Sequence, residues 1–346
     1  MNTTKTIAAT ALFLSTGAGA ASLGGPLNLA DEGSFFVNGE NVTSQYPGAS
    51  LVTGPTPPGR ITVNQMYVHY RIPATATGVP VIMVHGSNHS GVTYETTPDG
   101  REGWATYFVR RGHPVYVIDH AGRGRSGFNP TRINEVRDKA GANPAALPTL
   151  FFGTHERAWV NFRFGPEYGK PFPNLQFPLE ALDQYLQQLI VNSETALERG
   201  AAHTIDALAA LLDKTGPAVV MVHSQSGTYG VDVVKKRPQL VRALVSVEGG
   251  CENLGADDAK TAFAKIPFVS VWGDNSVGAK GTVNGDDRRN RCLQAVETIK
   301  SAGGRATHLM LPSMGIAGNS HMMMMDKNNL QVADVILKWL GDNAAR

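Results

Sequence analysis

The stretch Val219-Val-Met-Val-His-Ser-Gln-Ser-Gly227 decides the fold, because it joins a buried strand to a helix through a serine. Residues 219–222 are continuously apolar, as expected for a parallel strand that is covered on both faces. A helical pattern begins directly after Ser224. A serine on such a sharp turn exposes its hydroxyl above the sheet, beside the N–H of the next residue. The pattern therefore predicts Ser224 as a nucleophile, with Gln225 contributing a backbone N–H.

Two other interpretations of this stretch are open. The usual motif has small residues two positions before and after the serine, whereas here Val222 and Ser226 occupy those positions and Gly227 comes one later. Ser226 could be the nucleophile instead, but it lies two residues past the strand. Ser224 could also do no more than cap the helix. The strand-to-turn geometry favours Ser224.

On either side of this stretch, from about residue 60, short β-rich apolar segments alternate with longer helical patterns. Such alternation predicts an α/β fold, with a mainly parallel sheet and helices on both faces. The predicted strands are Ile61–Ile72, Val79–Val84, Pro114–Asp119, Ala218–His223, Leu240–Val247, Pro267–Trp272 and Thr307–Leu311. The predicted helices are Trp104–Arg111, Ala181–Lys214, Tyr229–Arg237, Arg288–Ala302 and Asn328–Asp342.

One long segment interrupts this alternation. About a hundred residues separate Asp119 from Ala218, where a simple crossover needs only a few dozen. Its residues 128–178 are rich in proline, glycine, asparagine and aromatic side chains. We expect one domain over residues 21–346 with a cap-like insertion at about 128–200. The insertion either roofs a pocket at the carboxyl edge of the sheet or packs on its own aromatic side chains at the surface.

A second motif, Val84-His-Gly-Ser-Asn-His-Ser-Gly91, also follows a buried strand. In hydrolases with a strand–serine–helix turn, a loop in this place supplies the other backbone donor to the oxyanion. By position the donor is the N–H of Ser87, which would act with that of Gln225. The histidines of this loop lack carboxylates or cysteines at metal-ligand spacing. We therefore expect no metal and no cofactor.

The nucleophile needs a base, and chain order selects it among ten histidines. In this type of hydrolase the order is serine, acid, histidine, with the histidine after the last strand. His308 lies within the last predicted strand, and His321 is the one histidine after it, following a polar, glycine-rich loop. We predict that His321 is the base, with a pKa near the ordinary 6.5 adjusted by its acid partner. His321 could instead fill the core before the four methionines that follow it.

Two carboxylates stand at predicted strand ends and could orient the imidazole. Glu248 follows the strand beside the serine strand, and Asp274 follows the next one. An aspartate in the later position is the commoner arrangement, but the longer Glu248 side chain could also reach. The residues alone leave both candidates open.

The chain resembles the α/β-hydrolase fold esterases and, within them, a small branch of exported bacterial esterases with an H-S-Q-S-G turn. The similarity extends over residues 80 to 340. The matching segments are Glu95-Thr-Thr-Pro-Asp-Gly-Arg-Glu-Gly-Trp104, Tyr116-Val-Ile-Asp-His-Ala-Gly-Arg-Gly-Arg-Ser126, Phe162-Arg-Phe-Gly-Pro166, His223-Ser-Gln-Ser-Gly227, Ser246-Val-Glu248, Gly318-Asn-Ser-His-Met-Met-Met324 and Asn328-Asn-Leu-Gln-Val-Ala-Asp334.

The resemblance implies a catalytic triad of Ser224, His321 and Glu248, and so favours Glu248 over Asp274. The branch has two adjacent cysteines in the oxyanion loop, where this chain has Ser87-Asn88. A backbone N–H can keep its role without them, but the rigidity of the loop then needs another source.

Residues 1–20 have the outline of a secretory signal peptide: Lys5, a short apolar run and Ala18-Gly-Ala20. We therefore expect a periplasmic or secreted protein. In an oxidising compartment, the two cysteines, Cys251 and Cys292, would most simply form one disulfide. Two unrelated buried thiols are the alternative.

Composition narrows the classes of function. Thirty-one Lys and Arg against 29 Asp and Glu leave a net charge of +2 with no basic block, which argues against a nucleic-acid partner. No apolar run is long enough to span a membrane. We expect a serine hydrolase that cleaves small-molecule carboxylic esters. A lactonase, thioesterase or amidase would use the same residues, and a non-catalytic binding module could share the scaffold. The oligomeric state stays open, a homodimer included.

Overall fold

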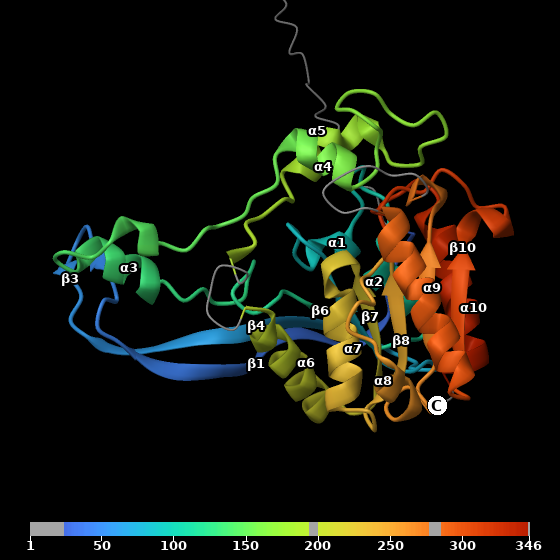
Figure 1. Ribbon diagram of the computed structural model, residues 1–346, viewed down its shortest axis with the longest axis horizontal. Coiled ribbons are helices and arrows are strands. Elements are labelled where there is room, and N and C mark those ends of the chain that lie inside the picture. Colours follow the sequence, from blue (N-terminus) through green and yellow to red (C-terminus); the bar gives the residue numbers. More distant parts are fainter. Residues whose placement is uncertain (1–23, 194–199, 277–284, 345–346) are drawn as a thin grey trace, which may run out of the picture.

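A mixed sheet forms the centre of the molecule (Figure 1). The structure is a computed structural model that describes residues 24–193, 200–276 and 285–344, so the predicted signal peptide lies outside the described residues. In the described part of the chain, eight strands pair in the order β1-β4-β6-β5-β7-β8-β9-β10. Their bounds are β1 Leu29–Ser44, β4 Gly59–Pro73, β5 Val81–Val84, β6 Val115–Ile118, β7 Ala218–His223, β8 Val241–Val247, β9 Phe268–Trp272 and β10 Ala306–Met310.

The six strands from β6 to β10 in this order are parallel, and β4 and β1 add an antiparallel edge. The parallel strands are apolar along their length because alternate residues face two different cores. In β7, Val219 and Met221 face one core, whereas Val220 and Val222 face the other. The predicted α/β class with a mainly parallel sheet is confirmed.

Helices cover both faces of this sheet. One core includes side chains of α2 (Trp104–Arg110) and α10 (Asn329–Asn343). The other includes side chains of α6 (Ala201–Thr215), α7 (Gly227–Lys236), α8 (Ala256–Lys260) and α9 (Gly285–Ser301). The helix α7 follows the serine turn directly, so the first turn of this helix stands at the carboxyl edge of the sheet.

Two elements differ from the sequence-based predictions. The strand β1 was not predicted, because it pairs only with β4 and has one exposed face, so its apolar signal is weak. The single helix predicted over Ala181–Lys214 is wrong: the structure has a short α5 (Leu182–Leu186) and a separate α6. Gly200, with φ of +38°, immediately precedes α6, and such a left-handed residue interrupts a continuous helix.

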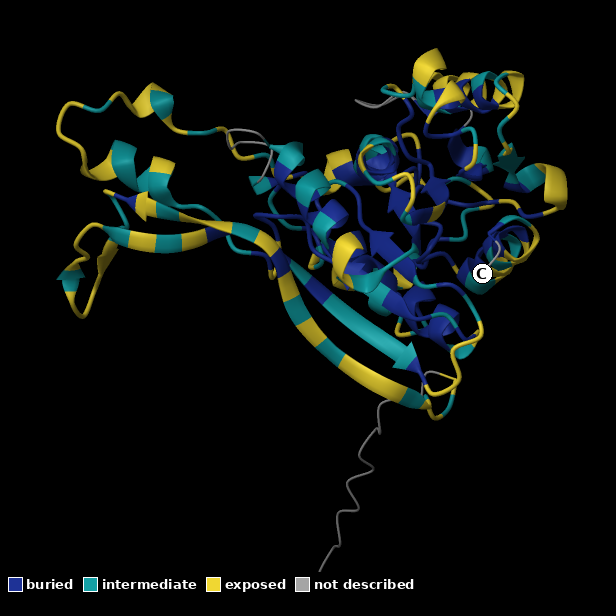
Figure 2. Cartoon of the chain, turned by 90° about the horizontal axis from the view of Figure 1, so that it is seen from below, coloured by how far each residue is buried: buried dark blue, intermediate teal, exposed yellow. Residues whose placement is uncertain are grey.

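The long insertion divides into two parts. Its first part contains α3 (Thr131–Asp138) and the short helix η1 (Pro144–Ala146), and lies beside the small sheet of β2 (Ala49–Ser50) and β3 (Gly54–Pro55). A hydrogen bond from Thr131 Oγ1 to Ser44 Oγ joins the two segments. Together, residues 41–60 and 129–150 form an arm that extends away from the body (Figures 1 and 2).

The second part of the insertion contains α4 (His155–Asn161), the short helix η2 (Leu179–Ala181) and α5. It returns to the body and contacts the loops at the carboxyl ends of the strands. One such contact is the hydrogen bond from Ile190 N–H to Asn88 O. This second part is therefore placed to shape the site, whereas the first part is not.

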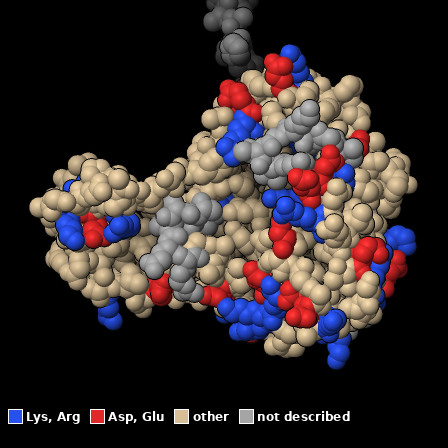
Figure 3. Space-filling view, viewed as in Figure 1, with Lys and Arg blue, Asp and Glu red and all other residues tan. Residues whose placement is uncertain are grey.

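Charges of both signs lie side by side on the face shown in Figure 3. In the ranges described here, no helix combines the length and the apolar character needed to cross a membrane.

Candidate active site

Ser224 stands at the turn between β7 and α7, in the short helix η4 (Ser224–Ser226). Its φ is +53°, a left-handed conformation that is rare for a non-glycine residue. The turn is tight because α7 starts against the loop that follows β8. A Cβ atom on Gly227 would lie 2.1 Å from Gly250 N, so only glycine fits there. This contact accounts for the glycine three residues after Ser224.

Ser226, the other candidate nucleophile, is fully buried beneath the turn. Its hydroxyl donates a hydrogen bond to the carbonyl oxygen of His85 and lies 2.9 Å from His120 Nε2. The Ser226 side chain therefore ties the serine turn to neighbouring strand ends. Ser224, which is 7% exposed, is the serine that meets the candidate base.

His321 lies between Ser224 and Glu248. Its Nε2 is 2.8 Å from Ser224 Oγ, and its Nδ1 is 2.6 Å from Glu248 Oε2. The backbone N–H of His321 donates to Phe162 O, and the Phe162 ring lies nearly parallel to the imidazole. The insertion therefore helps to orient the imidazole of His321.

Glu248 follows β8 directly, has φ of +45° and is fully buried. Its Oε1 accepts a hydrogen bond from Gly273 N at 3.0 Å, which leaves Oε2 for the histidine. Asp274, the alternative acid, instead accepts hydrogen bonds from the N–H groups of Gly318 and Asn319. Asp274 thus holds the loop that carries His321 and has no hydrogen bond to the imidazole itself.

Arg163 also enters this group, and its role was not predicted from the sequence. It comes from the second part of the insertion, has φ of +60° and is 3% exposed. Its Nη1 donates a hydrogen bond to Glu248 Oε2 and lies 2.9 Å from His321 Nδ1. The segment Phe162-Arg-Phe-Gly-Pro166 belonged to the resemblance, but nothing in the residues linked this arginine to a carboxylate 85 positions later.

Burial and positive charge lower the pKa values of the histidines here. For His321, desolvation is the largest cause and the Arg163 guanidinium the next, and together they hold the pKa of the imidazole well below its usual 6.5. Burial likewise lowers the pKa of the neighbouring His223 to about 3. Burial acts on Arg163 in the same direction and lowers the pKa of its guanidinium to about 9. The candidate base is therefore neutral in the resting site at ordinary pH.

The loop of Ser87 packs directly on the nucleophile. A Cβ atom on Gly86 would lie 2.9 Å from Ser224 Cβ and 2.8 Å from His223 Nδ1, so the close approach requires glycine. Arg123, which is 1% exposed, donates to the carbonyl oxygen of Gly86 at 2.8 Å. It also contacts the side chain of Gln225 at 3.2 Å. Ser87 and Gln225, the predicted oxyanion residues, thus lie on two different elements. The buried side chain of Arg123 joins these two elements.

Asn192 holds this loop through two side-chain hydrogen bonds. Its Oδ1 accepts from Asn88 N at 2.7 Å, and its Nδ2 donates to Ser87 Oγ at 2.6 Å. Asn88 Nδ2 in turn donates to Ile190 O at 3.0 Å. Asn88 has φ of +59°, a conformation that asparagine tolerates better than most residues. Polar contacts from the insertion therefore hold the loop in place.

Cys251 and Cys292 form a disulfide that links the loop after Glu248 to α9. The pairing expected from the sequence is confirmed. His85 and His89 are buried, with pKa values lowered by burial to about 3 and about 4. Within the described residues, no cluster of three or more His, Cys, Asp or Glu side chains could hold a metal ion.

Comparisons with known proteins found relatives, among them one described as an esterase and another described as a lipase. No protein-family model matches the chain. The chain is 40% identical to a solved structure described as a novel bacterial esterase, with a TM-score of 0.87, covering 93% of this chain and 98% of the other. It is also 28% identical over 324 residues to a probable secreted lipase of Fungal sp. (strain ATCC 74256), covering 80% of this chain and 85% of the lipase.

The fold and the sequence of this chain both match the bacterial esterase over 93% of the chain. A mostly parallel eight-stranded sheet with helices on both faces is the framework on which the residues discussed above are placed. The resemblance expected from the sequence motifs is confirmed by the 40% identity to an esterase of nearly equal extent. The chain belongs to the α/β-hydrolase fold esterases and is a carboxylic ester hydrolase.

Proposed function

We propose that this protein is a serine esterase that cleaves carboxylic esters through an acyl-enzyme, with Ser224 as nucleophile, His321 as base and Glu248 as acid. The observation that supports the proposal best is one continuous series of short contacts. Ser224 Oγ lies 2.8 Å from His321 Nε2, and His321 Nδ1 lies 2.6 Å from Glu248 Oε2. A nucleophile, a base and an orienting carboxylate in this order are what acyl transfer requires.

In the first half of the reaction, neutral His321 takes the hydroxyl proton of Ser224 as Oγ attacks the ester carbonyl. The N–H groups of Ser87 and Gln225 stabilise the negative oxygen of the tetrahedral intermediate. His321 then gives the proton to the leaving alcohol, and the acyl-enzyme remains. In the second half, His321 takes a proton from water, which attacks the acyl group and releases the acid. Glu248 stays ionised and stabilises the transient imidazolium.

Export of the protein is the second part of the proposal. The relative that is 28% identical is described as secreted, and Cys251 and Cys292 form a disulfide, a bond that persists in oxidising compartments. Together with the signal-like residues 1–20, these observations favour a periplasmic or extracellular location. Fractionation of the native host, followed by N-terminal sequencing of the mature chain, tests it; a cytoplasmic chain that keeps Met1 would contradict it.

A covalent probe tests the nucleophile. A fluorophosphonate ester should add one phosphonyl group to the wild-type protein, and peptide mass spectrometry should locate the group on Ser224. Ser224→Ala should abolish labelling and lower kcat by about 10⁴-fold or more, as in other serine hydrolases that lose the nucleophile.

Ser226→Ala is the matched control, since it removes the same atom two positions later. Its hydroxyl bonds the carbonyl oxygen of His85, so this variant should lose some thermal stability and still take the label. Labelling of Ser224→Ala together with loss of labelling in Ser226→Ala would contradict the assignment.

A further inference from the structure

Arg288 lies beside the candidate nucleophile, on the first turn of α9. Its Nη1 is 3.4 Å from Ser224 Oγ, which is a long contact for a hydrogen bond. The side chain is 18% exposed, so most of the guanidinium is removed from solvent. Burial lowers the pKa of Arg288, which is the usual consequence of withdrawing a cation from water. A buried cation at the reaction centre needs a compensating partner.

The protein supplies Arg288 with little compensation. An arginine has five N–H donors, but the only hydrogen bond found for Arg288 within the described residues is the long one to Ser224 Oγ. Its Nε is buried and has no hydrogen-bond partner there. The nearest carboxylate oxygen, Oε1 of Glu252, is 3.9 Å from this Nε. The guanidinium of Arg288 therefore keeps donors available for a ligand at the nucleophile.

The other arginines near the site are already engaged. Arg163 donates to Glu248, and Arg123 donates to Gly86 O and contacts Gln225. Arg289, the next residue of α9, pairs with Asp286 at 2.6 Å and contacts Ser276 Oγ. Arg288 thus differs from its neighbours in having no close protein acceptor among the described residues.

We propose that Arg288 is a specificity-determining residue that binds a carboxylate of the substrate, so that the preferred substrates are esters with a free carboxylate a few bonds from the scissile carbonyl. This inference rests on the proposed function, because it places the scissile carbonyl at Ser224 Oγ. A reacting carbonyl carbon lies about 3–3.5 Å from the attacking oxygen. A carboxylate that pairs with the guanidinium at about 2.8 Å is then within reach of a two- or three-carbon spacer. Planar arginine suits this bidentate contact better than lysine does.

Two pairs of esters test the proposal, because the carboxylate could belong to the acyl or to the alcohol part. For the acyl part, monoethyl succinate is compared with ethyl levulinate, in which a methyl group replaces the carboxylate oxygen. For the alcohol part, O-butanoyl glycolate is compared with acetonyl butyrate, which differs in the same way. The measured quantity is the ratio of kcat/KM for the charged ester to that for its neutral counterpart, at pH 7.5 and constant ionic strength.

We expect the wild-type enzyme to prefer the charged ester in at least one pair, with a ratio above ten. Arg288→Gln should lower that ratio by about 10- to 100-fold, the range for loss of a charge-assisted hydrogen bond. Most of the loss should appear in KM for the charged ester, because the contact forms on binding. Arg288→Lys should recover part of the preference, since it keeps the charge without the planar fork.

Arg289→Gln is the matched control, because it removes one positive charge from the adjacent position. Its ratio should stay within about twofold of the wild-type value, since the charge of Arg289 is paired. A wild-type preference for the neutral ester in both pairs, or an unchanged ratio in Arg288→Gln, would overturn the role of Arg288 and leave the esterase intact. A wild-type protein that cleaves none of the four esters and takes no fluorophosphonate label would overturn the proposed function itself.

Discussion

Positive φ angles occur at four non-glycine residues around the site: Asn88, Arg163, Ser224 and Glu248. Each of these conformations costs of order 1–3 kcal/mol and persists only where the surroundings enforce it. At Ser224 and Glu248 the strand has just ended, so a left-handed residue turns the chain sharply and leaves the side chain at the edge of the sheet. Strain is therefore concentrated where the side chains have to meet.

Substitution of the two carboxylates tests which one acts on His321. Glu248→Gln should lower kcat by up to about 10⁴-fold, because an amide neither stabilises the imidazolium nor holds the correct tautomer. Asp274→Asn should cost much less activity, since Asp274 bonds the N–H groups of Gly318 and Asn319. It should instead lower the melting temperature by weakening that loop. Kinetics and melting curves of both variants check this; an inactive Asp274→Asn beside an active Glu248→Gln would reverse the assignment.

Arg163 should control the pH dependence of activity. Burial and the Arg163 charge lower the pKa of His321, so kcat/KM should rise with pH along a limb whose apparent pKa lies below 6.5. Arg163→Gln removes one of these two causes, so the apparent pKa should move upward. The variant should accordingly lose most activity on the acid side of the profile and less at pH 8.

The readout for Arg163 is the position of the limb, which a merely structural role would not shift. Arg163→Lys keeps a cation and should leave the limb close to its wild-type position. An acid limb that stays in place in Arg163→Gln, with activity lowered equally at all pH values, would show that the arginine acts through packing alone.

At the scale of elements, the loop after β8 and the helix α9 are joined covalently. The loop carries Glu248, the helix carries Arg288, and the disulfide between Cys251 and Cys292 joins the two. The bond closes a loop across a sequence separation of 41 residues. In the chain-entropy model, a loop of this length stabilises the folded state by about 4 kcal/mol.

Removal of the disulfide should therefore lower stability strongly. The double variant Cys251→Ala/Cys292→Ala should lose about 4 kcal/mol of unfolding free energy, measured by urea denaturation. Reducing agent should destabilise the wild-type protein and leave the double variant unchanged, which controls for other effects of the reductant. Equal denaturation midpoints for the oxidised wild type and the double variant would exclude a stabilising role.

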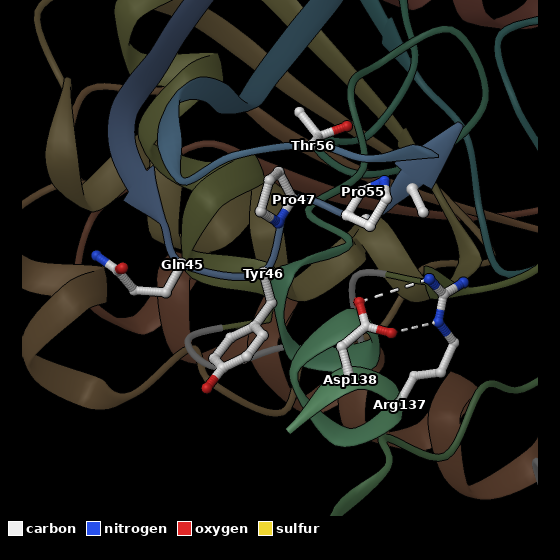
Figure 4. A pocket seen from close by; sticks show the side chains of 9 residues that line it. Gln45, Tyr46, Pro47, Pro55, Thr56, Arg137 and Asp138 are labelled. Carbon is white, nitrogen blue, oxygen red and sulfur yellow. Dashed lines mark hydrogen bonds and ion pairs between the residues drawn. The ribbon is translucent and has the colours of Figure 1, made fainter. Parts of the chain in front are cut away.

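At the scale of the whole molecule, the arm is the part that the hydrolase framework does not explain. It exposes the large apolar residues Leu51, Val52, Leu147 and Leu150, and Figure 2 shows how much of its surface is exposed. A groove of about 360 Å³ lies between residues 45–56 and α3. Its lining includes Tyr46, Pro47, Arg137 and Asp138 (Figure 4).

We expect a second copy of the chain to cover this arm. The arm has four basic residues, Arg60, Arg132, Arg137 and Lys139, against two acidic ones, Glu135 and Asp138, and both acidic side chains are paired within the arm. The expectation rests on the exposed apolar side chains, because contacts between identical subunits are more apolar at their centre than the rest of a protein surface. Light scattering should therefore give a mass near twice that of one chain, whereas Leu51→Asp/Val52→Asp should shift the protein toward the monomer.

Leu293→Asp is the control for this experiment, because Leu293 is also an exposed apolar residue but lies on α9 in the body. It should leave the mass unchanged. A wild-type protein that is monomeric at micromolar concentration would contradict the expectation.

The sequence by itself determined the fold class and predicted most of the candidate site. Residues 219–227 carry a buried strand, a serine and a helix start within nine positions, and the periodicities of the other strands and helices are equally local. Such local patterns can be recognised without the tertiary structure, because each depends on residues only a few positions away. The position of His321 after the last strand followed from chain order in the same way.

Only the tertiary structure decided which distant groups meet at the base. The residues alone left Glu248 and Asp274 open, and the resemblance favoured Glu248; the contact between Glu248 and His321 itself spans 73 residues. Arg163 reaches His321 across 158 residues, and Asn192 reaches Asn88 across 104. Likewise, the division of the insertion into an arm and a part that contacts the site left no sign in composition. Such contacts depend on how whole elements pack, and no periodicity within one segment encodes the distance to another.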